Sequence, residues 1–224
     1  SYKGQKCGTF GDFGVLSFNG NKIITTSSGG ALVCKSQEAK LRAIFLATQA
    51  KDHAPHYQHS EIGYNYRITE FQSAIALGQL DKIDDLMFWR KKSGQLITDV
   101  LKSTDLFETQ VTPEYIDHSF WCVGAKFKDG LEGWYKFRDM IYKECGERVF
   151  GAWKVPYNEP VMETGNYKKY LADKNKESVT TMGTCPNAES IQREMMVFKT
   201  KYRNDMALNN FLNGLRSSIK KYKS

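Results

Sequence analysis

A single lysine, Lys22, interrupts a run of small and apolar residues at positions 14–34, GVLSFNGNKIITTSSGGALVC. The usual explanation of such a residue is a surface lysine on a turn, because lysine is rarely buried. Here Asn19, Gly20 and Asn21 allow the backbone to approach a ligand closely, and the residues after Lys22 are apolar or small. Partial burial favours the neutral form of an amine, which attacks carbonyl groups. The segment therefore predicts a lysine that can condense with an aldehyde.

Ser17 lies five residues before Lys22, at the end of a β-like run. Its hydroxyl can donate a hydrogen bond to a phosphate held beside the amine. Chemistry on a phosphorylated aldehyde needs both groups, a neutral amine and a phosphate donor. We therefore expect Ser17 and Lys22 to belong to one site.

Three histidines, His53, His56 and His59, repeat at every third position of a segment that also contains Pro55. A zinc site needs side chains that converge on a tetrahedral centre, and this spacing alone does not provide one. Pro55 argues against a regular helix, and no cysteine is close in sequence. We expect no metal here, and we interpret residues 51–66 as a long loop whose histidines contact a ligand or another chain.

Several other function classes have little support in the sequence. It contains no Gly-x-x-x-x-Gly-Lys-Ser/Thr loop, no Gly-x-Gly-x-x-Gly turn between a strand and a helix, and no Gly-x-Ser-x-Gly elbow. The net charge of +7 is spread along 224 residues and gathers only at Lys220, Lys221 and Lys223. It favours anionic ligands in general, and we do not expect nucleic acid as a partner.

The cysteines and the length of the apolar runs indicate the cellular compartment of the protein. Five cysteines, an odd number with no Cys-x-x-Cys pair, indicate reduced thiols and a cytoplasmic protein. No apolar run approaches the roughly 20 residues that cross a bilayer, and no export pattern is visible, so we expect no membrane contact. The chain begins with Ser1 rather than Met, which suggests that something precedes it.

The residue patterns predict an α/β protein of one large or two modest domains. Expected strands cover residues 13–18, 23–26 and 31–34, and Ser36 caps a helix that reaches about residue 50. Thr69-Glu70-Phe71-Gln72 is a capping box before an apolar stripe, which predicts one long helix to about residue 100.

The second half of the chain shows fewer signals. We expect a strand over 118–127, a helix over 133–145 that Gly146 ends, and a loop-rich stretch over 151–186. Asn187 is a candidate cap for a short helix, and Asn204 or Asp205 for a final one. A domain break is expected within 90–110.

Two long segments resemble the DegT/DnrJ/EryC1/StrS family of pyridoxal-phosphate-dependent sugar aminotransferases. Residues 8–33, GTFGDFGVLSFNGNKIITTSSGGALV, resemble its lysine segment, and residues 56–84, HYQHSEIGYNYRITEFQSAIALGQLDKID, resemble its Gly-Tyr-Asn-x-Arg loop and following helix. A third segment, CPNAESIQREMMVF at 185–198, is similar to a late motif. The resemblance implies the type I aminotransferase fold, with the C-terminal part of the large domain at 1–100 and the small α/β domain at 101–224.

The resemblance also implies roles for individual residues. Lys22 matches the lysine that binds the cofactor pyridoxal 5'-phosphate covalently, and Ser17 matches the serine that bonds its phosphate. Asn65 matches an asparagine that reaches the cofactor phosphate of the neighbouring subunit, which implies a homodimer. Asn21, His59 and Arg67 are candidates for contact with the substrate.

The implied reaction moves an amino group from an amino-acid donor, glutamate by family habit, to a ketone on a nucleotide-linked deoxysugar of a surface polysaccharide or glycan. In the family, the upstream elements that bind the cofactor ring and phosphate precede the segment matched here. We therefore expect a missing N-terminal part, removed or supplied as a separate chain. The alternative is a non-catalytic remnant of the fold that serves as an oligomerisation or anion-binding module.

Overall fold

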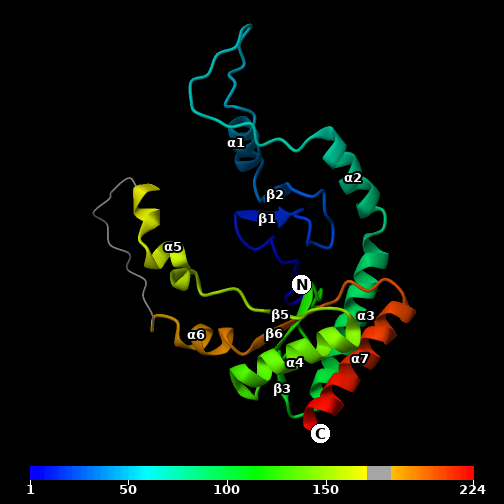
Figure 1. The fold of residues 1–224 in the computed structure, drawn as a ribbon. Helices are drawn as coiled ribbons and strands as arrows, with labels where there is room; N and C mark the ends of the chain where they lie inside the picture. The colour runs from blue at the N-terminus through cyan, green and yellow to red at the C-terminus, as the bar shows by residue number, and fades with distance from the viewer. Residues whose placement is uncertain (171–182) are drawn as a thin grey trace. The chain divides into compact units, whose positions relative to one another are not determined.

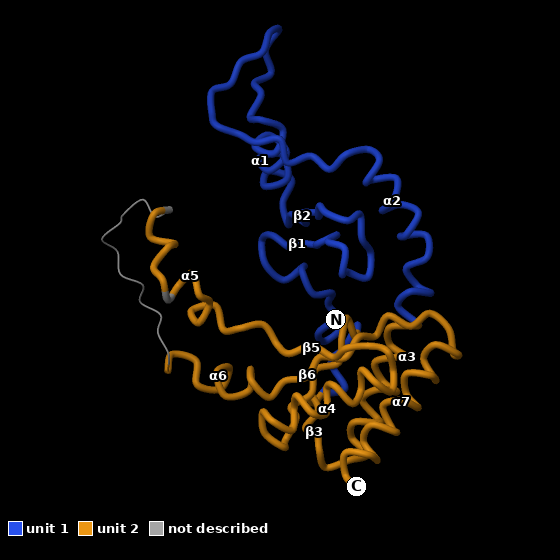
Figure 2. Tube along the Cα trace, in the orientation of Figure 1, with its two compact units in different colours: residues 1–88, 112–119 blue, residues 89–111, 120–224 orange. Residues whose placement is uncertain are grey.

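The computed structural model describes residues 1–170 and 183–224 and contains helices and strands in both halves of the chain (Figure 1). It divides into two compact units, drawn in two colours in Figure 2. Unit 1 comprises Ser1–Phe88 and Thr112–Ser119, and unit 2 comprises Trp89–Val111 and Phe120–Ser224. The assignment of 1–100 and 101–224 to a large and a small aminotransferase domain stays a prediction.

Unit 1 is built on a two-stranded antiparallel sheet of β1 (Phe13–Ser17) and β2 (Gly30–Cys34). The register pairs Phe13 with Cys34 and Ser17 with Gly30, so the turn-side end of the sheet carries the loop 18–29. The expected strands over 13–18 and 31–34 are confirmed. The expected strand over 23–26 is wrong, because these residues lie in the loop and bond to a helix instead of a strand.

Helix α1 (Gln37–Ala47) begins where expected, with the Ser36 hydroxyl accepting from Ala39 N at 3.1 Å. It ends three residues before the expected end at residue 50. The physical reason is that Gln49 and Ala50 have φ values of 71° and 49°, in the left-handed region, which a continuing α-helix excludes.

Helix α2 (Glu70–Leu80) begins at the capping box: Thr69 and Gln72 bond each other's backbone, which confirms that prediction. The expected single helix to about residue 100 is wrong, because α3 (Ile83–Lys102) is a separate helix. At the break Lys82 N bonds Gln79 O, three residues back, at 3.1 Å, which tightens the last turn of α2.

Unit 2 contains a four-stranded antiparallel sheet in the order β3-β4-β6-β5. Its strands are β3 (Phe107–Thr109), β4 (Cys122–Phe127), β5 (Phe150–Gly151) and β6 (Met195–Lys199). Burial alternates along β4, which sends Val123, Ala125 and Phe127 into the core. Side chains of α3, α4 (Gly130–Cys145) and α7 (Asp205–Lys223) complete this core. Figure 1 shows α4 and α7 beside each other.

Two of the three helix ends predicted in unit 2 agree with the structure. Gly146 ends α4 with φ 68°, and the Asn204 side chain caps α7 by accepting from Ala207 N at 2.8 Å, so both predictions are confirmed. The cap at Asn187 is wrong: α6 (Pro186–Gln192) begins one residue earlier with Cys185 at the cap position. Pro186 presets the backbone for the first helical turn, which fixes the start there.

The expected loop-rich stretch contains short helical segments: η1 (Pro156–Asn158), α5 (Pro160–Glu163) and η2 (Asn166–Tyr170). Positions 171–182 of that stretch lie outside the described residues. In the described part of the chain, none of the helices has the length and apolar character that crossing a membrane requires.

Candidate active site

The loop 18–29 carries Lys22 and folds back on the end of β1. Phe18 O accepts hydrogen bonds from Thr26 N and from the Thr25 hydroxyl, both at 3.0 Å, and Phe18 N donates to Gly29 O at 3.0 Å. Lys22 lies in a turn in which its own N–H donates to Asn19 O at 3.0 Å. These bonds close the loop into a compact structure in which Lys22 is half-buried.

Two glutamines of α2 hold the same loop from the other side. The Gln79 amide bonds both backbone polar groups of Thr25, and Gln72 Nε2 donates to Thr26 O at 3.3 Å and to the Ser28 hydroxyl at 2.9 Å. The two glutamines are seven residues apart, so they lie on one face of the helix. Thr26, which they help to enclose, is only 3% exposed.

The residues next to Lys22 remain accessible. Ser17 is exposed at the end of β1, and its hydroxyl accepts from Asn19 N at 3.4 Å. Asn21 is also exposed, and its Oδ1 accepts from the Asn19 amide at 3.2 Å. The structure thus places Ser17, Asn21 and Lys22 on one strand end and the loop that follows it. These residues carry a hydroxyl, an amide and an amine, respectively.

The remaining predicted residues lie on a second segment of unit 1, which packs along the end of α1. Tyr64 N bonds Leu46 O at 2.8 Å, and Tyr66 N bonds Ala47 O at 3.0 Å. A β-carbon at Gly63 would lie 2.3 Å from Ala50 N and 2.5 Å from Gln49 C, so only glycine fits this close approach.

On this segment the structure brings Asn65 and Arg67 together, since Arg67 Nε donates to Asn65 Oδ1 at 3.0 Å. His59 Nδ1 lies 2.9 Å from Gln49 O. A bidentate pair fixes the segment to α1: Arg42 Nη1 reaches Glu61 Oε1 at 2.7 Å, and Nη2 reaches Oε2 at 2.5 Å. The Arg42 guanidinium lowers the pKa of the Glu61 carboxyl. All three histidines of 53–59 are exposed, and the described residues include no group of three or more metal-binding side chains.

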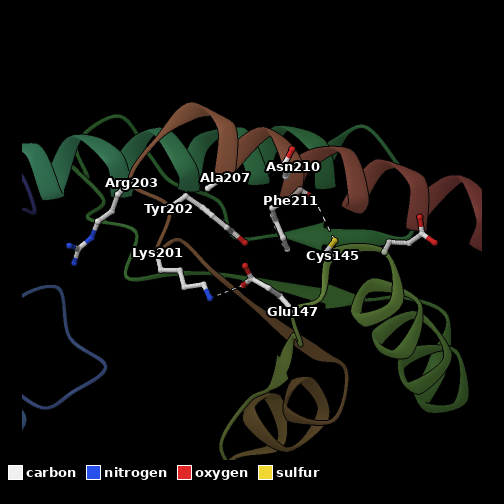
Figure 3. Close-up of a pocket in the computed structure, with 9 residues that line it drawn as sticks. Cys145, Glu147, Lys201, Tyr202, Arg203, Ala207, Asn210 and Phe211 are labelled. Atoms are coloured by element: carbon white, nitrogen blue, oxygen red, sulfur yellow. Dashed lines mark hydrogen bonds and ion pairs between the residues drawn. The ribbon is translucent and has the colours of Figure 1, made fainter.

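Unit 2 holds a pocket of about 510 Å³ that contains none of the predicted site residues (Figure 3). The end of α4, the segment after β6 and the first turns of α7 line it. Tyr202 is 5% exposed, and burial raises the pKa of its hydroxyl, as do the nearby Glu147 carboxylate and Cys145 thiol. Lys201 Nζ pairs with Glu147 Oε2 at 3.1 Å. The pocket therefore combines a protonated phenol with an ion pair.

Gln72 and Gln79, which position the loop, were not among the predicted site residues. Their seven-residue spacing after a capping box is the one local signal, because it places both amides on the same helix face as the buried Ala76. Their partners lie 44 to 54 residues away in sequence, so no local pattern could have named them.

Comparison with known proteins agrees with the fold and the motifs. The model of the DegT/DnrJ/EryC1/StrS aminotransferase family matches residues 1–204. The chain is 36% identical over 166 residues to EpsN of Bacillus subtilis, whose name describes a pyridoxal phosphate-dependent aminotransferase, covering 72% of this chain and 41% of EpsN. It is 38% identical over 201 residues to GDP-perosamine synthase of Escherichia coli O157:H7, covering 88% and 52%.

The solved aminotransferase PseC of Helicobacter pylori, involved in the biosynthesis of pseudoaminic acid, has a similar fold. The TM-score is 0.78 at 19% identity, over 99% of this chain and 57% of PseC. The chain thus spans about half the length of the relatives it matches. It belongs to the DegT/DnrJ/EryC1/StrS aminotransferase family. The family consists of enzymes that use pyridoxal phosphate, and the fold is that of its sugar aminotransferases.

Proposed function

We propose that this chain is the lysine-bearing part of an aminotransferase that moves an amino group from glutamate to the keto group of a nucleotide-linked deoxysugar. The observation that supports this most is the fixed loop around Lys22: a half-buried lysine, the exposed Ser17 at the end of the adjoining strand, and α2 amides that hold the loop. Relatives named for GDP-perosamine synthesis and for lipopolysaccharide biosynthesis support the choice of a nucleotide sugar and a surface glycan.

The residues present fit pyridoxal phosphate. The cofactor, when bound, withdraws electrons from the donor's α-carbon. Lys22 would hold the cofactor aldehyde, and its amine would move a proton at the donor's α-carbon. Ser17 would donate to the cofactor phosphate, and Asn65 would reach the phosphate held by a second subunit in a homodimer. Asn21, His59 and Arg67 contact the sugar or the donor, and Arg67 offers a guanidinium to a carboxylate or phosphate.

Part of the large domain outside these 224 residues is proposed to cover the β1–β2 sheet. Both faces of this sheet expose apolar side chains: on one face Val15 is 77% exposed, and on the other Leu16 is 44% exposed. A two-stranded sheet is marginal on its own, and apolar faces of this kind are normally packed. The same exposure favours the second candidate function, a remnant that only associates with other chains.

The test is reductive labelling. The purified chain is mixed with pyridoxal phosphate, reduced with borohydride and digested, and the modified lysines are identified by mass spectrometry. We expect label at Lys22, no such label in Lys22→Arg, and unchanged Lys22 labelling in Lys35→Arg, which changes an exposed lysine directly after β2. Label scattered over surface lysines, or equal label in Lys22→Arg, would contradict the proposal and favour the remnant.

A further inference from the structure

Trp121, the residue before β4, connects two unusual features of unit 2. Its carbonyl accepts from Arg90 Nη1 at 3.4 Å and from the Thr200 hydroxyl at 3.0 Å. Its ring stacks on Trp153 with the centroids 5.8 Å apart and the planes inclined by 23°. Arg90 comes from α3, Thr200 follows β6, and Trp153 follows β5. Three distant segments thus meet at one residue.

The first feature is a pair of arginines without an acidic partner. Arg90 is half-buried and donates to neutral oxygens, Trp121 O and the Thr200 hydroxyl at 3.1 Å. Burial lowers the pKa of Arg90, and the positive charge of Arg203 lowers it further. Within residues 1–170 and 183–224, neither guanidinium forms an ion pair with a carboxylate. Two neighbouring positive charges repel each other, so the arrangement favours an anion that contacts both.

The second feature is the tryptophan stack. Trp153 is 69% exposed although it is a large apolar ring, while Trp121 is half-buried beneath it. A flat ring that rests on a second ring and faces solvent is a platform for another planar group. Nucleobases stack on such rings, and stacking tolerates any base because every base has a π-face.

The backbone around Trp121 is held in a strained conformation. Phe120 has φ 49°, in the left-handed region, which a bulky residue adopts only when its surroundings enforce it. Its ring packs directly on Gly94 of α3, where an added β-carbon would lie 2.2 Å from Phe120 Cγ. The Thr200 hydroxyl lies 2.5 Å from Phe120 O, so its one proton is shared between the carbonyl oxygens of Phe120 and Trp121. These contacts fix the Trp121 carbonyl and ring before any ligand arrives.

We propose that Arg90, Arg203 and the Trp121–Trp153 stack bind a nucleoside diphosphate group, with the base on the tryptophans and the diphosphate at the arginines. The choice of a nucleoside diphosphate rests on the proposed function, since that substrate is nucleotide-linked. Arg203 also lines the pocket of Figure 3, where its side chain extends away from Glu147 and Cys145. Arg203 therefore lies at the edge of this pocket, and its guanidinium is directed away from the Lys201–Glu147 ion pair.

The test is a titration of the 224-residue chain with UDP and GDP, followed by tryptophan fluorescence. We expect saturable quenching, because a stacked base quenches the indole. Trp153→Phe should lose most of this signal. Arg203→Gln should weaken binding about tenfold or more, while Arg216→Gln, an exposed arginine of α7 outside the site, should bind like the unsubstituted chain. Trp153 and Arg203 are exposed, so neither substitution removes core packing.

Three results would overturn the inference. The first is no saturable change in tryptophan fluorescence up to about 10 mM nucleotide, and the second is equal affinity of Arg203→Gln and the unsubstituted chain for UDP. The third is inorganic pyrophosphate binding as tightly as UDP, which would exclude stacking of the base on the tryptophans. The labelling at Lys22 tests the proposed function independently of nucleotide binding. Label at Lys22 without UDP binding contradicts only this inference, and UDP binding without label contradicts only the proposed function.

Discussion

The Gln79 side chain bonds Thr25 as a neighbouring strand would, with Oε1 accepting from Thr25 N at 3.0 Å and Nε2 donating to Thr25 O. Gln79 lies near the end of α2, and Thr25 follows Lys22 by three residues. The loop that carries the candidate nucleophile is thus held from two sides, by the backbone of Phe18 at the end of β1 and by a helix that begins at the capping box.

Replacing this glutamine should therefore loosen the loop. Gln79→Ala leaves two part-buried backbone groups of Thr25 unpaired, which costs about 1–3 kcal/mol for such groups. We expect lower stability in urea unfolding and several-fold less borohydride-trapped pyridoxal at Lys22. Gln37→Ala, at an exposed position in the first turn of α1, is the control and should change neither quantity. Unaltered labelling in Gln79→Ala would show that α2 does not position Lys22.

Gly63→Ala tests the segment that carries Asn65 and Arg67. The new β-carbon would lie 2.3 Å from Ala50 N, and a backbone atom cannot move aside as a flexible side chain can. We expect a loss of about 2 kcal/mol or more in unfolding free energy and faster hydrogen exchange at Tyr64 and Tyr66. Gly20→Ala, where the β-carbon meets nothing within 4 Å, serves as the matched glycine substitution. Normal exchange at both tyrosines would contradict the close packing of this segment on α1.

Local signals in the sequence were sufficient for the helix ends. Ser36, Thr69, Asn204 and Gly146 each act within a few residues of their position, and all four were predicted and found. The strand over 23–26 failed for the opposite reason. Its β-branched residues fit a strand, but they bond the carbonyl of Phe18 and side chains of α2 about 50 residues away in place of a strand ladder.

In the candidate site, too, the residues that are close in sequence were predicted and their distant partners were not. Lys22, Ser17 and Asn21 are neighbours in sequence, and the structure keeps them on one strand end and loop. The supports Gln72 and Gln79 could not be found locally. The Arg90–Trp121 bond likewise joins residues 31 apart in sequence, and nothing in the FWRKK or HSFWC segments links them.

Gly94→Ala should destabilise unit 2. The added β-carbon would lie 2.2 to 2.5 Å from three atoms of Phe120, whose backbone is already in the left-handed region. Overpacking of this kind costs about 1–3 kcal/mol, so we expect a lower urea midpoint and altered fluorescence from Trp121. Gly78→Ala in α2 meets nothing within 4 Å and should be neutral or stabilising by up to about 1 kcal/mol, because alanine favours helix. Equal midpoints for the two variants would contradict the tight contact at Gly94.

The thiol of Cys145 should make stability depend on pH in the alkaline range. Burial, together with the carboxylates of Glu147 and Glu144, raises its pKa to about 11, from 9.0 in the unfolded chain. The folded protein therefore retains a proton that the unfolded chain releases. This contribution is complete below pH 9 and disappears as the pH rises through 11, at about 1–2 kcal/mol after allowance for residual solvent access.

Urea midpoints of the native chain and Cys145→Ala, measured at steps between pH 8 and 11, isolate this contribution. Tyr222 is present in both proteins, so its effect cancels in the comparison. Tyr202 lies beside Cys145, but burial is the main cause that raises the pKa of its hydroxyl, and the folded protein keeps it protonated across this window with or without the thiol. We expect the native chain to lose stability more steeply than Cys145→Ala across the window, whatever the substitution does to stability at pH 8. Parallel curves would mean that the Cys145 thiol titrates as it does in the unfolded chain, and that the contacts of Gly214 and Phe211 with its sulfur do not keep it from water.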